Sequence, residues 1–207
     1  MHVVSFGANI DTARTQEDID TLISNRNNPL KLLFVGVDWL RKGGAKALEV
    51  TTILNERGIE TELHIVGSSP PIDRLPTYVH LHGFLKKTDP IEAKKITSLF
   101  EQSHFLILPS SADCTPIVFS EANSFGVPCI STDVGGITSV IKNNINGYAF
   151  DLDASAEKYA DYIQEKSKDE RVYRSLAQSS FLEYKNRLNW ETAGIIMMKI
   201  FENLVKK

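Results

Sequence analysis

The sequence contains little cysteine and no long apolar run. Cys114 and Cys129 are the only cysteines among 207 residues, which argues against a disulfide framework and predicts reduced thiols in a cytoplasmic compartment. The apolar runs are too short to cross a bilayer. The N-terminus also lacks the charged and then apolar plan of a signal peptide. We therefore expect a cytoplasmic protein.

Neither sign of charge is in large excess. Lys and Arg number 23, Asp and Glu number 26, and the net charge is -3. Because the basic residues are dispersed along the sequence, we expect no nucleic-acid partner. The hydrophobic fraction of 42% and the charged fraction of 24% are those of an ordinary globular core.

Several short motifs of known chemistry are also missing. The sequence contains neither a G-x-G-x-x-G nor a Walker A loop, so nicotinamide and NTPase functions gain no support. No G-x-S-x-G elbow surrounds Ser110 and Ser111, which weakens a hydrolase reading. No His, Cys or Asp spacing resembles a metal site, and His64 and His80 are expected to be structural residues within strands. We therefore predict no metal.

The chain does show a regular alternation of apolar strands and helices. Predicted strands cover residues 31–36, 61–67, 79–83, 104–108, 127–131 and 147–150. Predicted helices cover residues 15–25, 44–57, 89–102 and 115–125, with a short one from 138 and helical chain after 154. This pattern predicts an α/β fold, a doubly wound, parallel, Rossmann-like sheet of about six strands with helices on both faces and C-terminal helices. Residues 1–28 are expected to form a linker with a short helix. Residues 29–207 are expected to form the Rossmann-like domain that binds the ligand.

Three helix starts have specific signals. Thr15 is a candidate N-cap for the first helix. Asp89 precedes a proline and stands three residues before Glu92, as in a capping box. Thr115 is followed by Pro116, which suits the first position of a helix.

Residues 109–136 carry the strongest site signal. Asp113 is expected on the loop before a helix and Glu121 about one and a half turns inside it. The amide groups at the helix start can hold a phosphate, and the two carboxylates can accept hydrogen bonds from a diol. The alternative is a capped helix with two solvated acids.

The other rim loops of the predicted sheet hold further candidates, each with a structural alternative. Arg41 and Lys42 follow the first strand and either bind phosphate or are solvated. Gly83 either lets a planar ligand approach the backbone or is a turn glycine. Gly135-Gly136 either forms an amide nest or is a tight connection.

These residues belong to a set of motifs spread over about residues 30–205. The set comprises Gly36, Lys42-Gly43, Asp113, Glu121-Ala122, Phe125-Gly126-Val127-Pro128, Gly135-Gly136, Asn146-Gly147 and Trp190. In this order it resembles the C-terminal domain of retaining glycosyltransferases with the GT-B fold, in the large family numbered four. Two positions depart from the family pattern: a usual Glu is Asp113, and a usual Arg is Val37. Arg41 is the candidate to supply that missing charge.

The resemblance implies roles for particular residues. Glu121 would bind the ribose diol of the donor, Lys42 its diphosphate, and Asp113 would face the sugar; these three form the catalytic set. The same resemblance implies that further residues contact the donor substrate: Gly36, Arg41, Gly83, Phe84, Cys114, Thr115, Pro116, Ile117 and Val118.

The resemblance also implies an activity, which is transfer of a sugar from a nucleotide diphosphate sugar to an acceptor hydroxyl with retained configuration. No cofactor or metal would be needed. The chain would begin in the linker, lacking the N-terminal acceptor domain, and would be inactive alone; only that domain could associate with a membrane. Two alternatives are a non-catalytic nucleotide-sugar-binding module and a GT-B relative such as a phosphorylase or a nucleotide-sugar epimerase.

Overall fold

A computed structural model describes residues 3–10 and 13–205. Its centre is one sheet of six parallel strands in the order β3-β2-β1-β4-β5-β6. The strands are β1 (Leu30–Val35), β2 (Thr61–Val66), β3 (Val79–Leu81), β4 (Phe105–Leu108), β5 (Cys129–Thr132) and β6 (Gly147–Phe150). Every residue of β4 and β5 is buried, as expected for strands covered on both faces. The predicted doubly wound α/β fold is confirmed.

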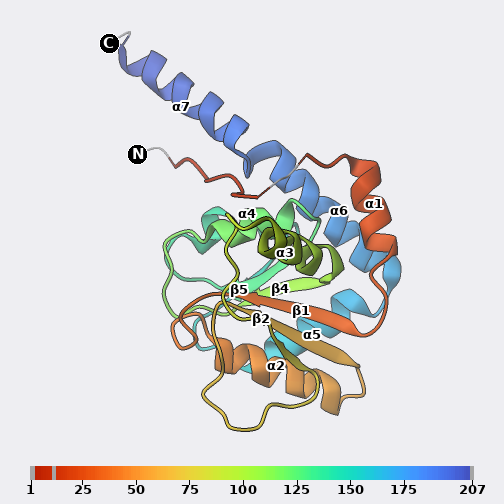
Figure 1. Ribbon diagram of the computed structural model, residues 1–207. Coiled ribbons are helices and arrows are strands. Elements are labelled where there is room, and N and C mark those ends of the chain that lie inside the picture. The colour runs from red at the N-terminus through yellow and green to blue at the C-terminus, as the bar shows by residue number, and fades with distance from the viewer. Residues whose placement is uncertain (1–2, 11–12, 206–207) are drawn as a thin grey trace.

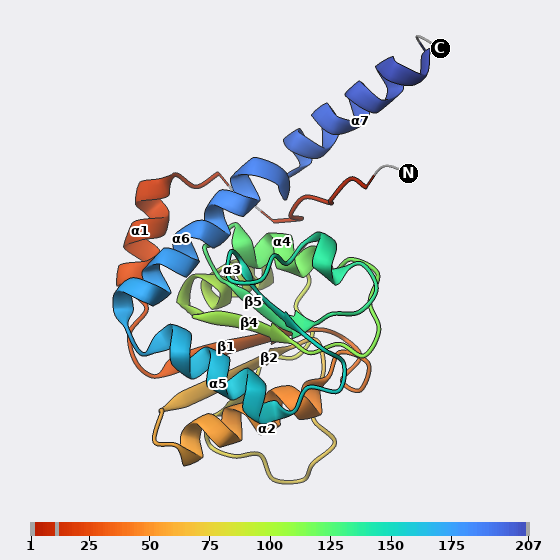
Figure 2. The ribbon, with the colours of Figure 1, turned by 180° about the vertical axis from the view of Figure 1, so that it is seen from behind.

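The helices cover both faces of this sheet. They are α1 (Gln16–Ser24), α2 (Gly44–Glu56), α3 (Pro90–Gln102), α4 (Ile117–Asn123), η1 (Ile137–Ser139), α5 (Ala156–Ser167), α6 (Glu170–Arg187) and α7 (Trp190–Val205). In Figure 1, α2 and α5 lie below the sheet and α3 and α4 above it. The helix α6 contacts α1, α4 and α5. Figure 2 shows α7 leaving the body of the molecule.

Two of the three predicted helix starts are confirmed in part or in full. Thr15 and Asp18 form the reciprocal bonds of a capping box at the start of α1. Asp89 caps α3 through the backbone N–H groups of Ile91 and Glu92. However, the predicted capping-box role of Glu92 is wrong, because its carboxylate accepts the backbone N–H of Lys86, in the preceding loop.

The predicted start of α4 is also wrong. Pro116 occupies the N-cap position, Ile117 is the first helical residue, and no side chain caps the helix. A residue before proline is disfavoured in the helical region, which moves the start beyond Thr115. The Thr115 hydroxyl instead lies against Gly136, where an added Cβ would come within 2.6 Å of it.

The order of the strands reverses between β1 and β4, and ligands of doubly wound sheets bind at such a point. The loops after these two strands are in contact, since the Ser111 N–H donates to the Arg41 carbonyl at 2.8 Å. Gly43 has φ +74°, and a Cβ there would lie 2.0 Å from the carbonyl oxygen of Pro109. Only glycine allows the two loops to approach this closely.

Arg26, in the turn after α1, joins four parts of the chain. Its guanidinium donates to the carbonyls of Glu101, Phe125 and Gly126 at 3.1, 2.6 and 2.8 Å. It also donates to the Tyr173 hydroxyl at 2.9 Å. Arg26 is 9% exposed, so these oxygens replace water as its partners and hold α1, α3, α4 and α6 together.

Replacing Arg26 by methionine keeps an unbranched apolar side chain in place of the arginine stem and removes all of its donors. The buried carbonyls at the ends of α3 and α4 then lose their partners, and we expect the free energy of unfolding to fall by roughly 2–5 kcal/mol. Urea unfolding followed by circular dichroism measures this loss. As a control, Arg171→Met, at an arginine whose side chain is 91% exposed, should leave the urea midpoint unchanged. If Arg26→Met and the parent had equal urea midpoints, the hydrogen bonds of Arg26 would not stabilise the packing of these helices.

Candidate functional site

Lys42 and Asp113 meet across the point where the strand order reverses. The Lys42 ammonium forms an ion pair with Asp113 Oδ2, and the two side chains are only 12% and 11% exposed. Arg41 Nη1 lies 3.7 Å from the same oxygen and donates to the Ala112 carbonyl at 3.1 Å. Two cations from the loop after β1 therefore converge on one carboxylate from the loop after β4. This geometry contradicts the picture of solvated side chains for Lys42 and Asp113.

Arg41, the candidate substitute for the missing arginine, lies beside Asp113, and its substitute role stays a prediction. Its Nε donates to Asp38 Oδ2 at 3.1 Å, which holds the guanidinium beside Asp113. Val37, where the resembling family has its usual arginine, is 65% exposed. The positive charge beside Asp113 therefore comes from Arg41, four residues after Val37 in the same loop.

Glu121 is buried on α4, with 2% of its surface exposed. Its Oε1 forms an ion pair with the Lys87 ammonium and accepts the Asn9 N–H at 3.2 Å. Burying a carboxylate is costly unless it is paired and hydrogen-bonded. Lys87, whose side chain is 39% exposed, compensates that cost from the rim of the molecule.

The segment before α1 packs onto the same helix. The Ser120 hydroxyl donates to the Phe6 carbonyl at 3.0 Å, next to the contact between Asn9 and Glu121. The indole N–H of Trp190 donates to Asn9 Oδ1 at 3.2 Å. The turn that contains Phe6 and Asn9 therefore lies between α4 and the start of α7. Whether residues 1–28 form a separate linker stays a prediction.

A cleft of about 390 Å³ opens beside Glu121 at the carboxyl ends of β1 and β2. Its lining is mostly apolar and comes from the strand ends, the following loops and the faces of α3 and α4: Val35, Gly36, Val37, Val66, Gly67, Phe84, Leu85, Lys86, Lys87, Thr88, Ile96, Phe100 and Glu121. Larger hollows of 560 to 670 Å³ lie beside α5 or α6, and none of them is lined by Lys42, Asp113 or Glu121. The cleft with an acid in its wall is the better candidate for ligand binding.

The Gly135-Gly136 turn shapes the loop that carries Asp113. Gly135 has φ +57°, and a Cβ there would lie 1.9 Å from the Asp113 carbonyl oxygen. The Gly136 N–H donates to that same oxygen at 3.4 Å. Because this amide has a partner, the geometry favours the tight connection over an open amide nest.

Two buried hydroxyls also follow strands at this edge of the sheet. Ser110 follows β4 and Pro109, and Ser68 follows β2 and Gly67. Within residues 3–10 and 13–205, neither hydroxyl has a hydrogen-bond partner. Unpaired buried hydroxyls are rare in folded proteins.

The predicted site residues separate into two neighbouring groups and a remainder. Arg41, Lys42 and Asp113 meet at the strand-order reversal, whereas Gly36, Phe84 and Glu121 line the cleft. Gly83 is not among the residues that line the cleft; it has φ +68°, and its carbonyl accepts the Gly67 N–H at 2.8 Å just beyond the ends of β2 and β3. Cys114, Thr115 and Pro116 form the loop before α4, which Ile117 and Val118 begin.

Sequence reasoning missed Lys87 and the backbone of Asn9. Both contact Glu121, although Lys87 lies 34 residues before it and Asn9 lies 112 residues before it. One available signal was the position of Lys87 in a rim loop after β3. The roles that the resemblance assigns to individual residues stay predictions.

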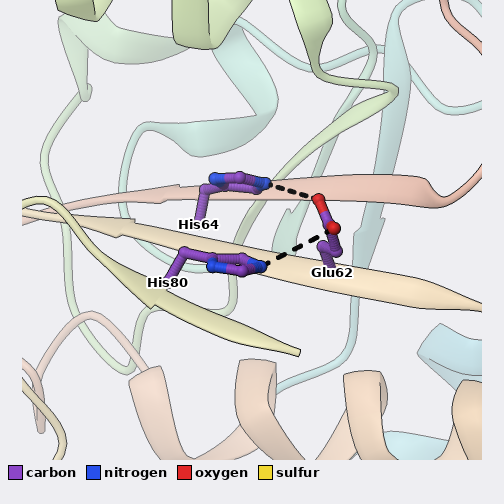
Figure 3. Close-up of side chains that lie close together, drawn as sticks. All are labelled: Glu62, His64 and His80. Carbon is purple, nitrogen blue, oxygen red and sulfur yellow. Dashed lines mark hydrogen bonds and ion pairs between the residues drawn. The ribbon is translucent and has the colours of Figure 1, made fainter. Parts of the chain in front are cut away.

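A second polar cluster lies away from this cleft, on β2 and β3. Glu62, His64 and His80 come within 4.8 Å of one another through one ligand atom each, as Figure 3 shows. The sequence spacing gave no sign of a metal-like cluster because His80 comes from a different strand, where the parallel register places it beside His64. Burial, together with the neighbouring His64, lowers the pKa of His82 at the end of β3 to about 4.

Among residues 3–10 and 13–205, no helix is both long and apolar enough to cross a membrane. The family described as glycosyl transferases group 1 matches residues 16–181. N-acetyl-alpha-D-glucosaminyl L-malate synthase of Bacillus anthracis is 30% identical over 126 residues, covering 58% of this chain and 32% of that protein. UDP-Gal:alpha-D-GlcNAc-diphosphoundecaprenol alpha-1,3-galactosyltransferase of Escherichia coli is 31% identical over 137 residues, covering 64% and 35%.

Solved structures agree with this match at the level of the fold. Sucrose-phosphate synthase from Thermosynechococcus elongatus has a TM-score of 0.74 and 19% identity, over 99% of this chain and 53% of its own. This chain therefore spans from about a third to about half of the length of these similar proteins. Since the family match covers the greater part of the sequence, the chain belongs to the glycosyl transferases of group 1, and its fold is that of their GT-B C-terminal domain.

Proposed function

We propose that this chain is the donor-binding half of a retaining glycosyltransferase, which moves a hexosyl group from a nucleotide diphosphate sugar to an acceptor hydroxyl. The observation that carries the proposal is the convergence of Lys42, Arg41 and Asp113 at the strand-order reversal, beside a cleft with Glu121 in its wall. Cations suit a diphosphate, a buried carboxylate suits a ribose diol, and an apolar cleft suits a base.

Negative charge gathers on the diphosphate as the bond to the sugar breaks. Fixed cations that face this developing charge stabilise the transition state more than the ground state. Lys42 and Arg41 are already held in place by Asp113. A bound diphosphate would share these cations with Asp113, whose carboxylate could then face the sugar.

Lys87 has a corresponding role in this proposal. In the chain alone it neutralises Glu121. A ribose diol that donates two hydrogen bonds to Glu121 would take over part of that task, because both hydroxyls are donors. Lys87 is partly exposed and could then turn toward the phosphate groups, so donor binding would exchange partners within the site without leaving a buried charge unpaired.

The chain binds the donor and, on this proposal, does not transfer the sugar by itself. Thermal unfolding with UDP-, GDP- and ADP-glucose should show a raised midpoint with at least one of the three, because a ligand of the native state stabilises it. Incubation of the same sample with donor and acceptor extracts should give no acceptor-dependent transfer. No shift with any nucleotide sugar would overturn the proposed function, whereas phosphate-dependent cleavage or epimer formation would identify a different GT-B activity.

Lys42→Ala tests the diphosphate contact. We expect it to weaken a nucleoside diphosphate by roughly 1.5–3 kcal/mol, the value of a charge-assisted hydrogen bond, and to leave the matching nucleoside nearly unaffected. Calorimetric titration of both ligands measures the difference. Lys199→Ala, at an exposed lysine on α7, serves as the matched control. Equal losses for nucleoside and diphosphate would assign Lys42 a purely structural role with Asp113.

Glu121→Gln tests the ribose contact. On the parent chain, a deoxyribonucleoside diphosphate should bind more weakly than the ribose form by roughly 1–3 kcal/mol, because one carboxylate oxygen loses its partner. The difference should shrink in Glu121→Gln, whose amide accepts at only one atom. If ribose and deoxyribose ligands bind the parent alike, Glu121 does not hold the diol and its burial serves the fold alone.

A further inference from the structure

Two features of strand geometry bring the cluster on β2 and β3 together. These are the alternation of side chains along β2 and the parallel register of β2 with β3. Glu62 and His64 are two residues apart on β2, so their side chains leave the same face of the sheet. His80 on β3 is the register partner of His64. Figure 3 shows both imidazoles side by side, each with a nitrogen directed at the Glu62 carboxylate.

The distances place three ligand atoms around one small space. His64 Nε2 lies 3.0 Å from Glu62 Oε2, and His80 Nε2 lies 3.7 Å from Glu62 Oε1. The two rings stack with their centroids 4.8 Å apart. In a tetrahedral site with bonds of about 2.0–2.1 Å, ligand atoms stand about 3.3–3.5 Å apart. Small side-chain rotations would therefore be enough to close these three atoms around an ion.

A fourth side chain orients His64. Its Nδ1 lies 3.0 Å from His82 Nε2, so a proton on Nδ1 can be donated to His82 and leave the lone pair of Nε2 free. Ligating histidines characteristically use their second nitrogen in this way.

We propose that Glu62, His64 and His80 form a binding site for a divalent transition-metal ion such as Zn²⁺. Two imidazoles and one carboxylate are a known ligand set for Zn²⁺ with one position left open, whereas Ca²⁺ and Mg²⁺ prefer oxygen ligands throughout. The side chain of His80 is 40% exposed, so the open position faces solvent and takes water or an external ligand.

The ion would join the edge strand of the sheet to its neighbour. β3 has three residues and is the edge strand of the sheet, paired with β2. The chain continues from β3 through His82 and Gly83 to Phe84, which lines the cleft beside Glu121. A metal at this site therefore steadies the base of a loop that borders the cleft. The proposal does not depend on the identity of the donor or on the transferase activity.

Titration of the metal-free full chain with zinc chloride tests the site. We expect saturable binding of one ion and a raised midpoint of thermal unfolding that EDTA reverses. Glu62→Gln and His80→Gln should each weaken Zn²⁺ at least 100-fold, and His82→Gln roughly 10-fold, as for an outer-shell partner. Glu60→Gln changes an exposed carboxylate directly before β2. This control variant should bind Zn²⁺ like the parent.

Co²⁺ identifies the ligands, because thiolate ligands add an intense charge-transfer absorption that imidazole and carboxylate ligands lack. The exposed Cys114 is the thiol to test, and Cys114→Ser should leave the Co²⁺ spectrum and the Zn²⁺ affinity unchanged. A thiolate band, equal affinities of the parent and Glu62→Gln, or no binding by the parent would each overturn the proposal. If His80→Gln does not fold, the partly exposed and isosteric Glu62→Gln decides the outcome.

Discussion

The seven-residue helix α4 carries Glu121, and buried hydrogen bonds at its C-terminal end fix its direction. Asn123 donates to the Val127 carbonyl at 3.0 Å and to Ser180 Oγ at 2.9 Å, and its own oxygen accepts from Asn146 at 2.7 Å. A helix of this length has little stability of its own. The hydrogen bonds of Asn123, together with those of Arg26, therefore hold the end of α4 against the segments that lead into β5 and β6. This packing fixes the position of Glu121 in the wall of the cleft.

The charges of the candidate site are arranged as ion pairs. Each of the two carboxylates, the partly buried Asp113 and the buried Glu121, has a lysine from another part of the chain beside it. Burying a lone carboxylate would cost several kcal/mol, and the paired arrangement avoids that cost before a ligand arrives. The two carboxylates therefore have a cationic partner in the chain alone, without any bound ligand.

The sequence predicted features that depend on local pattern. The parallel strands followed from apolar runs such as residues 104–108, and the position of Glu121 inside a helix followed from the helix-start signal before it. Features that depend on tertiary contacts escaped it. Lys87 reaches Glu121 from another loop, and His80 joins His64 only through the register of two strands. The predicted helix start at residue 115 was wrong because the residue before a proline is disfavoured in the helical region.

Both tryptophans of the chain flank the candidate site. Trp39 packs on Phe34 with ring centroids 5.5 Å apart, in the same loop as Lys42. Trp190 donates to Asn9, whose N–H reaches Glu121. Indole emission depends on the polarity around the ring, and the two indoles differ, since Trp39 is 8% and Trp190 49% exposed. The chain thus carries two intrinsic optical reporters, one for the cation side of the site and one for its carboxylate side.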